Sequence, residues 1–416
     1  MNSLKTKTNP QTNQTIEVQE VRRQAREIAD RVLAAPAEKR VRTYYDGLRA
    51  SVIPYMPCYM QEQAGDLYVR CYEALYYLGG ASIPLSVAFT MHLYNLASLA
   101  TLPVPAAPDF ERRRQILIDT VRRYKSLLAI SSFGENIKHK DDPFKNVIVT
   151  PKGDGSFLCE GRKGFQSMAS EADILLFSGL IDEHQGMFYT SIKDQSALVL
   201  GPSLFAGAMA ASDTRPVDFK GLVIRQRNVL SVHDDLTDHV SHYATAWFEA
   251  LATAVYLGGA CQALEEVRKF ARSVHTDDDT TLAELDGFVA ESGRLSVMLR
   301  SNLAMARSFG VCADLYCRLV REGAPAAQLD GVAADLMDCG SVIKYTATKA
   351  AQDIVAGARA LIGTRSMSVH HPIYSLTEQV CFGTMHPTIP ARMERSAGRE
   401  MLGEKPYTGL FEWAMV

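Results

Sequence analysis

The sequence of 416 residues lacks long apolar runs, an excess of charge of one sign and paired cysteine motifs. No stretch reaches the roughly 18 uninterrupted apolar residues of a membrane-spanning helix. With 44 basic against 47 acidic residues, a net charge of −3 gives no field that would attract a polyanion. The eight cysteines form no CxxC pair, which indicates a reducing compartment and no structural zinc. We therefore expect a cytoplasmic protein without nucleic-acid or membrane partners.

Several common catalytic signatures are also missing. The sequence has no HExxH, Walker A or GxSxG motif, and Gly258 and Gly259 lack a GxGxxG context. His370, His371 and His386 lie near one another in the sequence, but a metal site would need carboxylates or cysteines converging on them. The simpler interpretation is polar loop histidines, and we expect no metal.

The hydrophobic rhythm divides the chain into three parts after a polar tail, 1–15, that we expect to be disordered. Residues 16–128 and 233–416 have helical periodicity, whereas 129–232 carries short β-branched runs separated by glycine, proline and aspartate. Thr281 and Glu284 have the spacing of a capping box, and Gly363 is placed to end a helix from about 326 to 362. The prediction is an α+β, mostly α fold: a helical domain, a central antiparallel β-domain or small barrel, and a C-terminal helical bundle.

The stretch CEGRKGFQSMASEADILLFSG, residues 159–179, stands out within the β-rich part. A strand-like run around 157–161 is followed by a basic pair, an aromatic residue and small polar residues, and then by a second apolar run at 174–177. We expect these runs to form a hairpin. It is either a ligand-binding hairpin or an ordinary surface one.

This stretch and the order of the three parts resemble the acyl-CoA dehydrogenase superfamily of flavoproteins. The residues Gly161, Lys163, Phe165 and Ser167 resemble the family's Asn-Gly-Xaa-Lys-Xaa-Trp-Ile-Thr element, AISSFG at 129–134 resembles its Thr-Glu-Pro-Gly-like turn, and Ser212 matches the serine of its Gly-Met-Arg-Ala-Ser stretch. The resemblance implies that flavin contacts come from Ser131, Ser132, Gly134, Phe165, Ser167 and Ser212.

The departures from the family concern the catalytic base and the cofactor. Phe382 in CFGT stands where many family dehydrogenases carry a catalytic glutamate. Glu249 stands near the place of the base in another subset, and it is either that base or a glutamate on the helix surface. His92, on a strongly apolar helix, is either a satisfied core histidine or a catalytic one. FAD is expected, but the Arg-Xaa-Xaa-Phe-Gly sequence that helps hold its adenylate half is missing, so FMN or reduced flavin from a partner remains an alternative.

Three functions follow from the resemblance. The first is α,β-dehydrogenation of an acyl thioester, on CoA or a carrier protein, with Glu249 as the base and hydride transfer to flavin N5. The second is a two-component monooxygenase that receives reduced flavin from a reductase and hydroxylates carbon or nitrogen of a small molecule, with His92 or Ser131 near the flavin. The third is a flavin-binding relative that has lost catalysis. We favour the dehydrogenase, and the family also implies a homo-oligomer, a tetramer or dimer.

Overall fold

The computed structural model describes residues 16–104, 107–130, 147–182, 184–193, 196–232, 234–386 and 388–404. The first part of the chain is helical. Its α-helices are α1 (Val18–Ala34), α2 (Arg40–Ala50), α3 (Ala64–Ala81), α4 (Ile83–Thr101) and α5 (Pro108–Tyr124). Apolar residues at helical spacing explain α1, in which Val21, Ile28 and Val32 are buried on one face.

The middle of the chain forms one sheet in the order β6-β7-β3-β2-β4-β5-β8, with β1 paired to β4. Most pairings are antiparallel, as expected, but β4 runs parallel to both β1 and β2. The strands are β1 (Leu128–Ile130), β2 (Ile148–Pro151), β3 (Phe157–Gln166), β4 (Ile174–Ile181), β5 (His184–Ser191), β6 (Leu198–Leu200), β7 (Arg215–Ile224) and β8 (Val229–Ser231).

The expected hairpin between 157–161 and 174–177 is wrong. Strands β3 and β4 are not paired with each other, because β2 lies between them in the sheet. Residues 167–173 cross from one strand to the other. Near their start, Met168 has a left-handed conformation at a φ of 58°. The second apolar run is therefore a separate, central strand, and only β3 presents the residues that resemble the flavin element.

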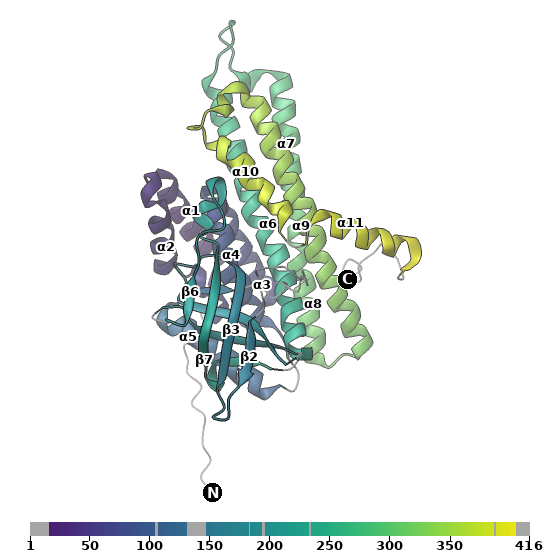
Figure 1. The fold of residues 1–416 in the computed structure, drawn as a ribbon. Helices are drawn as coiled ribbons and strands as arrows, with labels where there is room; N and C mark the ends of the chain where they lie inside the picture. Colours follow the sequence, from purple (N-terminus) through teal and green to yellow (C-terminus); the bar gives the residue numbers. More distant parts are fainter. Residues whose placement is uncertain are drawn as a thin grey trace.

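The C-terminal part is a helical bundle (Figure 1). Its helices are α6 (Asp234–Ser273), α7 (Asp286–Ala306), α8 (Ser308–Glu322), α9 (Ala326–Ile362), α10 (Pro372–Met385) and α11 (Pro390–Arg399). The capping box of Thr281 and Glu284 is present and opens the short 3-10 helix η5 (Leu282–Glu284) before α7. Gly363 ends α9 at a φ of 68°, where a side chain would be strained. The fold is thus confirmed as mostly α with a central sheet, and the domain boundaries themselves stay a prediction.

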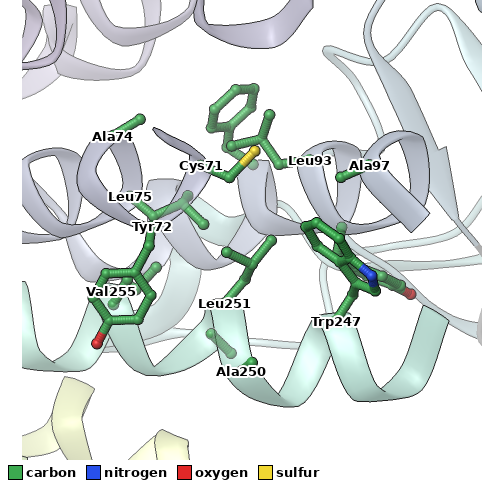
Figure 2. Packing of buried hydrophobic residues seen from close by; sticks show 14 of the residues in the cluster. Cys71, Tyr72, Ala74, Leu75, Leu93, Ala97, Trp247, Ala250, Leu251 and Val255 are labelled. Carbon is green, nitrogen blue, oxygen red and sulfur yellow. The ribbon is translucent and has the colours of Figure 1, made fainter. Parts of the chain in front are cut away.

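The core joins the first helical part to the bundle through α3, α4 and α6. Figure 2 shows Cys71 and Leu75 of α3, Leu93 of α4 and Leu251 of α6 packed together. A Cβ at Gly258 of α6 would lie 2.0 Å from the Tyr76 carbonyl oxygen, so only glycine permits this close approach to α3. Helix α4 is long and apolar enough to cross a membrane, but 94% of that window is buried, as in the core helix of a soluble protein. A cytoplasmic location stays a prediction.

Candidate active site

Phe165 lies where strand β3 bulges away from its neighbour β7. The pairing holds Lys163 opposite Val217 and resumes at Gln166 opposite Arg215, with a shift of register between them. Bulges bend a strand and redirect a side chain, and they are frequent beside active sites. Phe165 is 47% exposed and stacks on Phe205, with the ring centroids 6.4 Å apart. The bulge therefore places an aromatic ring at the surface of the sheet, at the end of β3.

A chain of hydroxyl groups lies directly after this bulge. The Thr214 hydroxyl is 2.9 Å from that of Ser167 and 2.9 Å from that of Ser212. The Met168 amide also donates to the Ser212 carbonyl at 3.0 Å, which fixes the two segments together. Beside them, Gln166 is fully buried, and its Oε1 has no hydrogen-bond partner in the described part of the chain. The structure thus brings the predicted Ser167 and Ser212 together, through a threonine that the sequence did not single out.

A row of aromatic side chains continues from the sheet to the helices. The centroid distances along it are 5.0 Å between Phe205 and Phe382, 4.4 Å between Phe382 and His386, and 5.8 Å between His386 and Phe248. We call this set the aromatic row; its members are Phe165, Phe205, Phe382, His386, Phe248 and, 5.2 Å beyond Phe248, Tyr94. The row connects β3 with α10, α6 and α4, and Phe382 lies in its middle.

His386 is the one member of the aromatic row with nitrogen atoms in its side chain. Its Nδ1 lies 3.4 Å from the Tyr256 hydroxyl oxygen. Burial, and after it the charge of Lys344, lowers the pKa of His386 to about 3, so the ring is neutral at ordinary pH. Burial also raises the pKa of Tyr256, so the phenol keeps its proton, and its hydroxyl either donates to Nδ1 or accepts from it, according to the tautomer of the ring.

Glu249 is buried on α6, next in sequence to Phe248, but its carboxylate is bonded away from the row. Oε2 accepts a hydrogen bond from the Ser341 hydroxyl at 2.5 Å, and Oε1 accepts one from the Thr388 amide at 3.1 Å. The side chain is 1% exposed. The sequence alternative of a surface glutamate is therefore wrong, and the carboxylate has a structural partner on each oxygen.

Lys344 of α9 completes this group of charges. It is 2% exposed, and its ammonium donates to the carbonyl oxygens of His386, at 3.0 Å, and Thr388, at 2.9 Å. Burial lowers the pKa of Lys344 to about 8, and the carboxylate of Glu249 opposes this shift. Nothing in the sequence pattern marks Lys344, because its partners follow 42 and 44 positions later in the chain.

His92, the other predicted catalytic residue, is a satisfied core histidine. Its Nδ1 accepts a hydrogen bond from the Leu128 amide at 2.9 Å, and Nε2 therefore carries the proton that it donates to the Pro54 carbonyl at 2.7 Å. Burial lowers the pKa of His92 to about 4. Because both nitrogens are used by the backbone, this geometry does not support a catalytic role.

Ser131, Ser132 and Gly134 lie outside the described residues. The His371 ring accepts from the Ile373 amide at the start of α10, so it caps that helix. Among the described residues, no group of three histidine, cysteine, aspartate or glutamate side chains is arranged to hold a metal ion.

No family model matches the chain. It is 26% identical over 207 residues to an isobutylamine N-hydroxylase of Streptomyces viridifaciens, an alignment that covers 48% of this chain and 54% of that protein. It is also 24% identical over 289 residues to a dibenzothiophene monooxygenase of Rhodococcus erythropolis, covering 66% of this chain and 68% of that one. The chain thus spans about half the length of the first of these relatives.

Solved structures agree over almost the whole chain. FMN-bound TdsC, a dibenzothiophene monooxygenase from Paenibacillus sp. A11-2, superposes with a TM-score of 0.77 at 21% identity, covering 94% of this chain and 99% of that chain. Butyryl-CoA dehydrogenase from Megasphaera elsdenii gives a TM-score of 0.72 at 15% identity, with the same coverage. The chain has the acyl-CoA dehydrogenase fold, and the resemblance seen in the sequence is confirmed.

The coarse functional prediction, a flavin-dependent oxidoreductase that uses FMN or FAD, agrees with these likenesses, which include an FMN-bound monooxygenase. They do not favour the finer prediction, dehydrogenation of an acyl thioester. The relatives found by sequence are an N-hydroxylase and monooxygenases, so the comparisons favour the alternative that the sequence left open.

Proposed function

We propose that this protein is a flavin-dependent monooxygenase that uses reduced flavin and O2 to hydroxylate nitrogen or carbon of a small molecule. The observation that carries the proposal is that no available carboxylate lies along the aromatic row among the residues the structure describes. By the sequence resemblance Phe382 stands where the dehydrogenase base would be, and Glu249 has a protein donor on each carboxylate oxygen. Abstraction of an α-proton needs a base within hydrogen-bond reach of the substrate, whereas oxygen transfer from flavin does not.

The end of strand β3 fits a flavin. An isoalloxazine ring has two carbonyl groups and an N–H on its polar edge and an apolar face, so it needs hydroxyl or amide donors, an acceptor and an aromatic or apolar neighbour. The half-buried Ser167 supplies a hydroxyl that can donate or accept, the buried Thr214 and Ser212 hydroxyls hold it in place, and Phe165 supplies the aromatic ring. In its reduced form the flavin would supply two electrons, so that one atom of O2 enters the substrate and the other leaves as water.

The aromatic row then forms the substrate side. Phe205, Phe382 and Phe248 present apolar rings that exclude water and favour a substrate with apolar or aromatic surface. Within this apolar row, the neutral His386 is the member whose side chain can form hydrogen bonds through ring nitrogens. We assign His386 to hydrogen bonding with the substrate, a role that the sequence did not predict.

A separate flavin reductase is the partner that this function requires. The proposed reaction consumes one reduced flavin per turnover, and the chain lacks a nicotinamide-binding GxGxxG motif. The absence of the Arg-Xaa-Xaa-Phe-Gly sequence agrees with a flavin that exchanges with a reductase. A carrier protein and the oligomeric state stay predictions.

The proposal is tested by supplying chemically reduced FMN, or FMN with a reductase and NADH, in air. Probe substrates are an aliphatic amine such as isobutylamine and the aromatic heterocycles indole and dibenzothiophene, with products identified by mass spectrometry. We expect one of these classes to gain one oxygen atom. The matched experiment uses oxidised FMN or FAD without air and a series of acyl-CoA thioesters; bleaching of the flavin by a thioester, without an oxygenated product from any probe, would contradict the proposal.

A further inference from the structure

The residues His386 and Thr388 are held from two sides by buried charges of opposite sign. Lys344 donates to both of their carbonyl oxygens, at 3.0 and 2.9 Å, and Glu249 accepts from the Thr388 amide at 3.1 Å. Ser341, one turn before Lys344 on α9, fixes the second oxygen of Glu249 at 2.5 Å. We call Glu249, Ser341 and Lys344 the clamp.

The clamp is unusual because two buried charged side chains bond to the main chain of one short connection. Buried charges cost several kcal/mol each in lost solvation, and they persist only where they are paired and fully hydrogen-bonded. Here the two charged side chains are 2% and 1% exposed and come from different helices, α9 and α6. Three of their hydrogen bonds go to the backbone of only two residues, which connect α10 with α11.

The clamp holds the main chain that carries the imidazole of His386. Its backbone is fixed by Lys344, while its ring has one long hydrogen bond, 3.4 Å to Tyr256, and otherwise contacts the aromatic rings of Phe382 and Phe248. Aromatic pairs contribute little beyond their burial, so they hold the ring less firmly than short hydrogen bonds to both nitrogens would. The position of the ring in the row therefore depends on where the clamp holds the main chain.

We infer that Lys344 and Glu249 are positioning residues for His386, and that they act by fixing the main chain at His386 and Thr388 rather than by touching the substrate. The inference rests on the proposed function for its effect on turnover, but the geometry can be tested without it. It also gives Glu249 a different role from the base that the sequence predicted.

The close contact between α6 and α9 is consistent with this role. A Cβ at Gly340, beside Ser341, would lie 2.9 Å from the Ala246 carbonyl oxygen, one turn before Glu249. A glycine at this point lets α9 approach α6 closely enough for the Ser341 hydroxyl to reach the carboxylate. The close crossing of α6 and α9 therefore brings Ser341 and Glu249 of the clamp within hydrogen-bond distance.

The test compares Lys344→Met, Ser341→Ala and a control, Lys349→Met, in the full chain. Lys349 lies on the same helix but is exposed and bonded to the Tyr345 hydroxyl at 3.0 Å. Each variant is crystallised without substrate, and the ratio of oxygenated product to hydrogen peroxide is measured with reduced FMN and a probe that the wild type accepts. We expect Lys344→Met to move the His386 ring and to lower the ratio at least about tenfold, Ser341→Ala to act in the same direction about threefold, and Lys349→Met to change neither.

A pH profile separates positioning from a general loss of stability. The titratable groups packed around His386 are Lys344 of α9 and Tyr256 and Glu249 of α6. Loss of the Lys344 charge raises the pKa of His386, so the product ratio of Lys344→Met should begin to fall at a higher pH than that of the wild type as the pH is lowered. An unmoved ring and an unchanged ratio in folded Lys344→Met would overturn the inference; if that variant does not fold, an unchanged Ser341→Ala would do so. If the wild type oxygenates none of the probes, the proposed function fails, and the crystal structures alone decide on the clamp.

Discussion

Two histidines with a lowered pKa lie in different regions of this molecule and do different things. Around His92, between α4 and β1, both ring nitrogens are hydrogen-bonded to the backbone. Around His386, between α6, α9 and α10, the ring has a single hydrogen bond of 3.4 Å to the described residues and a set of aromatic neighbours. Burial is the main cause of the pKa shift in both. A buried histidine with a lowered pKa therefore says little about function until its hydrogen bonds are counted.

The largest effect on stability should come from His92. In His92→Phe the Pro54 carbonyl and the Leu128 amide lose their partners while they remain buried, at about 1–3 kcal/mol each. We expect the free energy of unfolding in urea to fall by about 4 kcal/mol. The product-to-peroxide ratio of the folded fraction should be unchanged. A stable variant with a changed ratio would mean that His92, and not His386, is the functional member of the pair.

The second effect concerns the pH dependence of stability through Lys344. Its pKa is about 8 in the folded chain against an ordinary value of 10.5, so the unfolded chain binds more protons between these two values. The burial cost is present in full below pH 8 and disappears as the pH rises to 10.5. The free energy of unfolding should therefore gain about 3 kcal/mol over this window in the wild type relative to Lys344→Met. If denaturant titration gives the same pH dependence of the unfolding free energy for the two proteins, Lys344 is solvated and the account is contradicted.

His386→Phe should show the reverse of the His92 result. The aromatic contacts remain and only the 3.4 Å hydrogen bond to Tyr256 is lost, so we expect the unfolding free energy to fall by about 1 kcal/mol or less. The product-to-peroxide ratio should fall at least tenfold, about 1.4 kcal/mol in the transition state. A ratio equal to that of the wild type would place the functional nitrogen elsewhere.

The smallest effect should be on flavin binding. Thr214→Val removes the hydroxyl that bonds both Ser167 and Ser212, with little change of shape. One hydrogen bond is worth about 1 kcal/mol, so the Kd for reduced FMN should rise about fivefold, while Ser203→Ala, on an exposed loop, serves as the control. Equal affinities in a fluorescence titration of the three proteins would remove the hydroxyl chain from the flavin site.

The comparison of the two histidines also shows what the sequence could and could not predict. Helical periodicity, the capping box at Thr281 and Glu284 and the helix end at Gly363 are local, and the structure contains them. The predicted hairpin is wrong because strand pairing in a sheet is not local. Strand β2 lies between β3 and β4 although it precedes both in the chain. The clamp was invisible for the same reason, since Lys344 and Glu249 are 95 positions apart and meet only at Thr388.

The site was predicted in part. Phe165, Ser167 and Ser212 were found through a motif, and the structure gathers them near Thr214 and the bulge. For Glu249 the sequence left a catalytic base and a surface glutamate open, and its partners, which come from α9 and from Thr388, decide its role. His386 was considered as a metal ligand or, more simply, a polar loop histidine, because its aromatic neighbours come from α6 and α10 and from a loop before η3 (Gly207–Ser212).

The most direct test of the central claim is to follow the oxygen atom. The protein is mixed with reduced FMN and ¹⁸O2 in the presence of the amine and heterocycle probes, and the products are examined by mass spectrometry. The account predicts a product that carries one ¹⁸O atom and whose yield depends on His386. A desaturated acyl thioester formed without ¹⁸O, with reduction of oxidised flavin and loss of the reaction in Glu249→Gln, would contradict it.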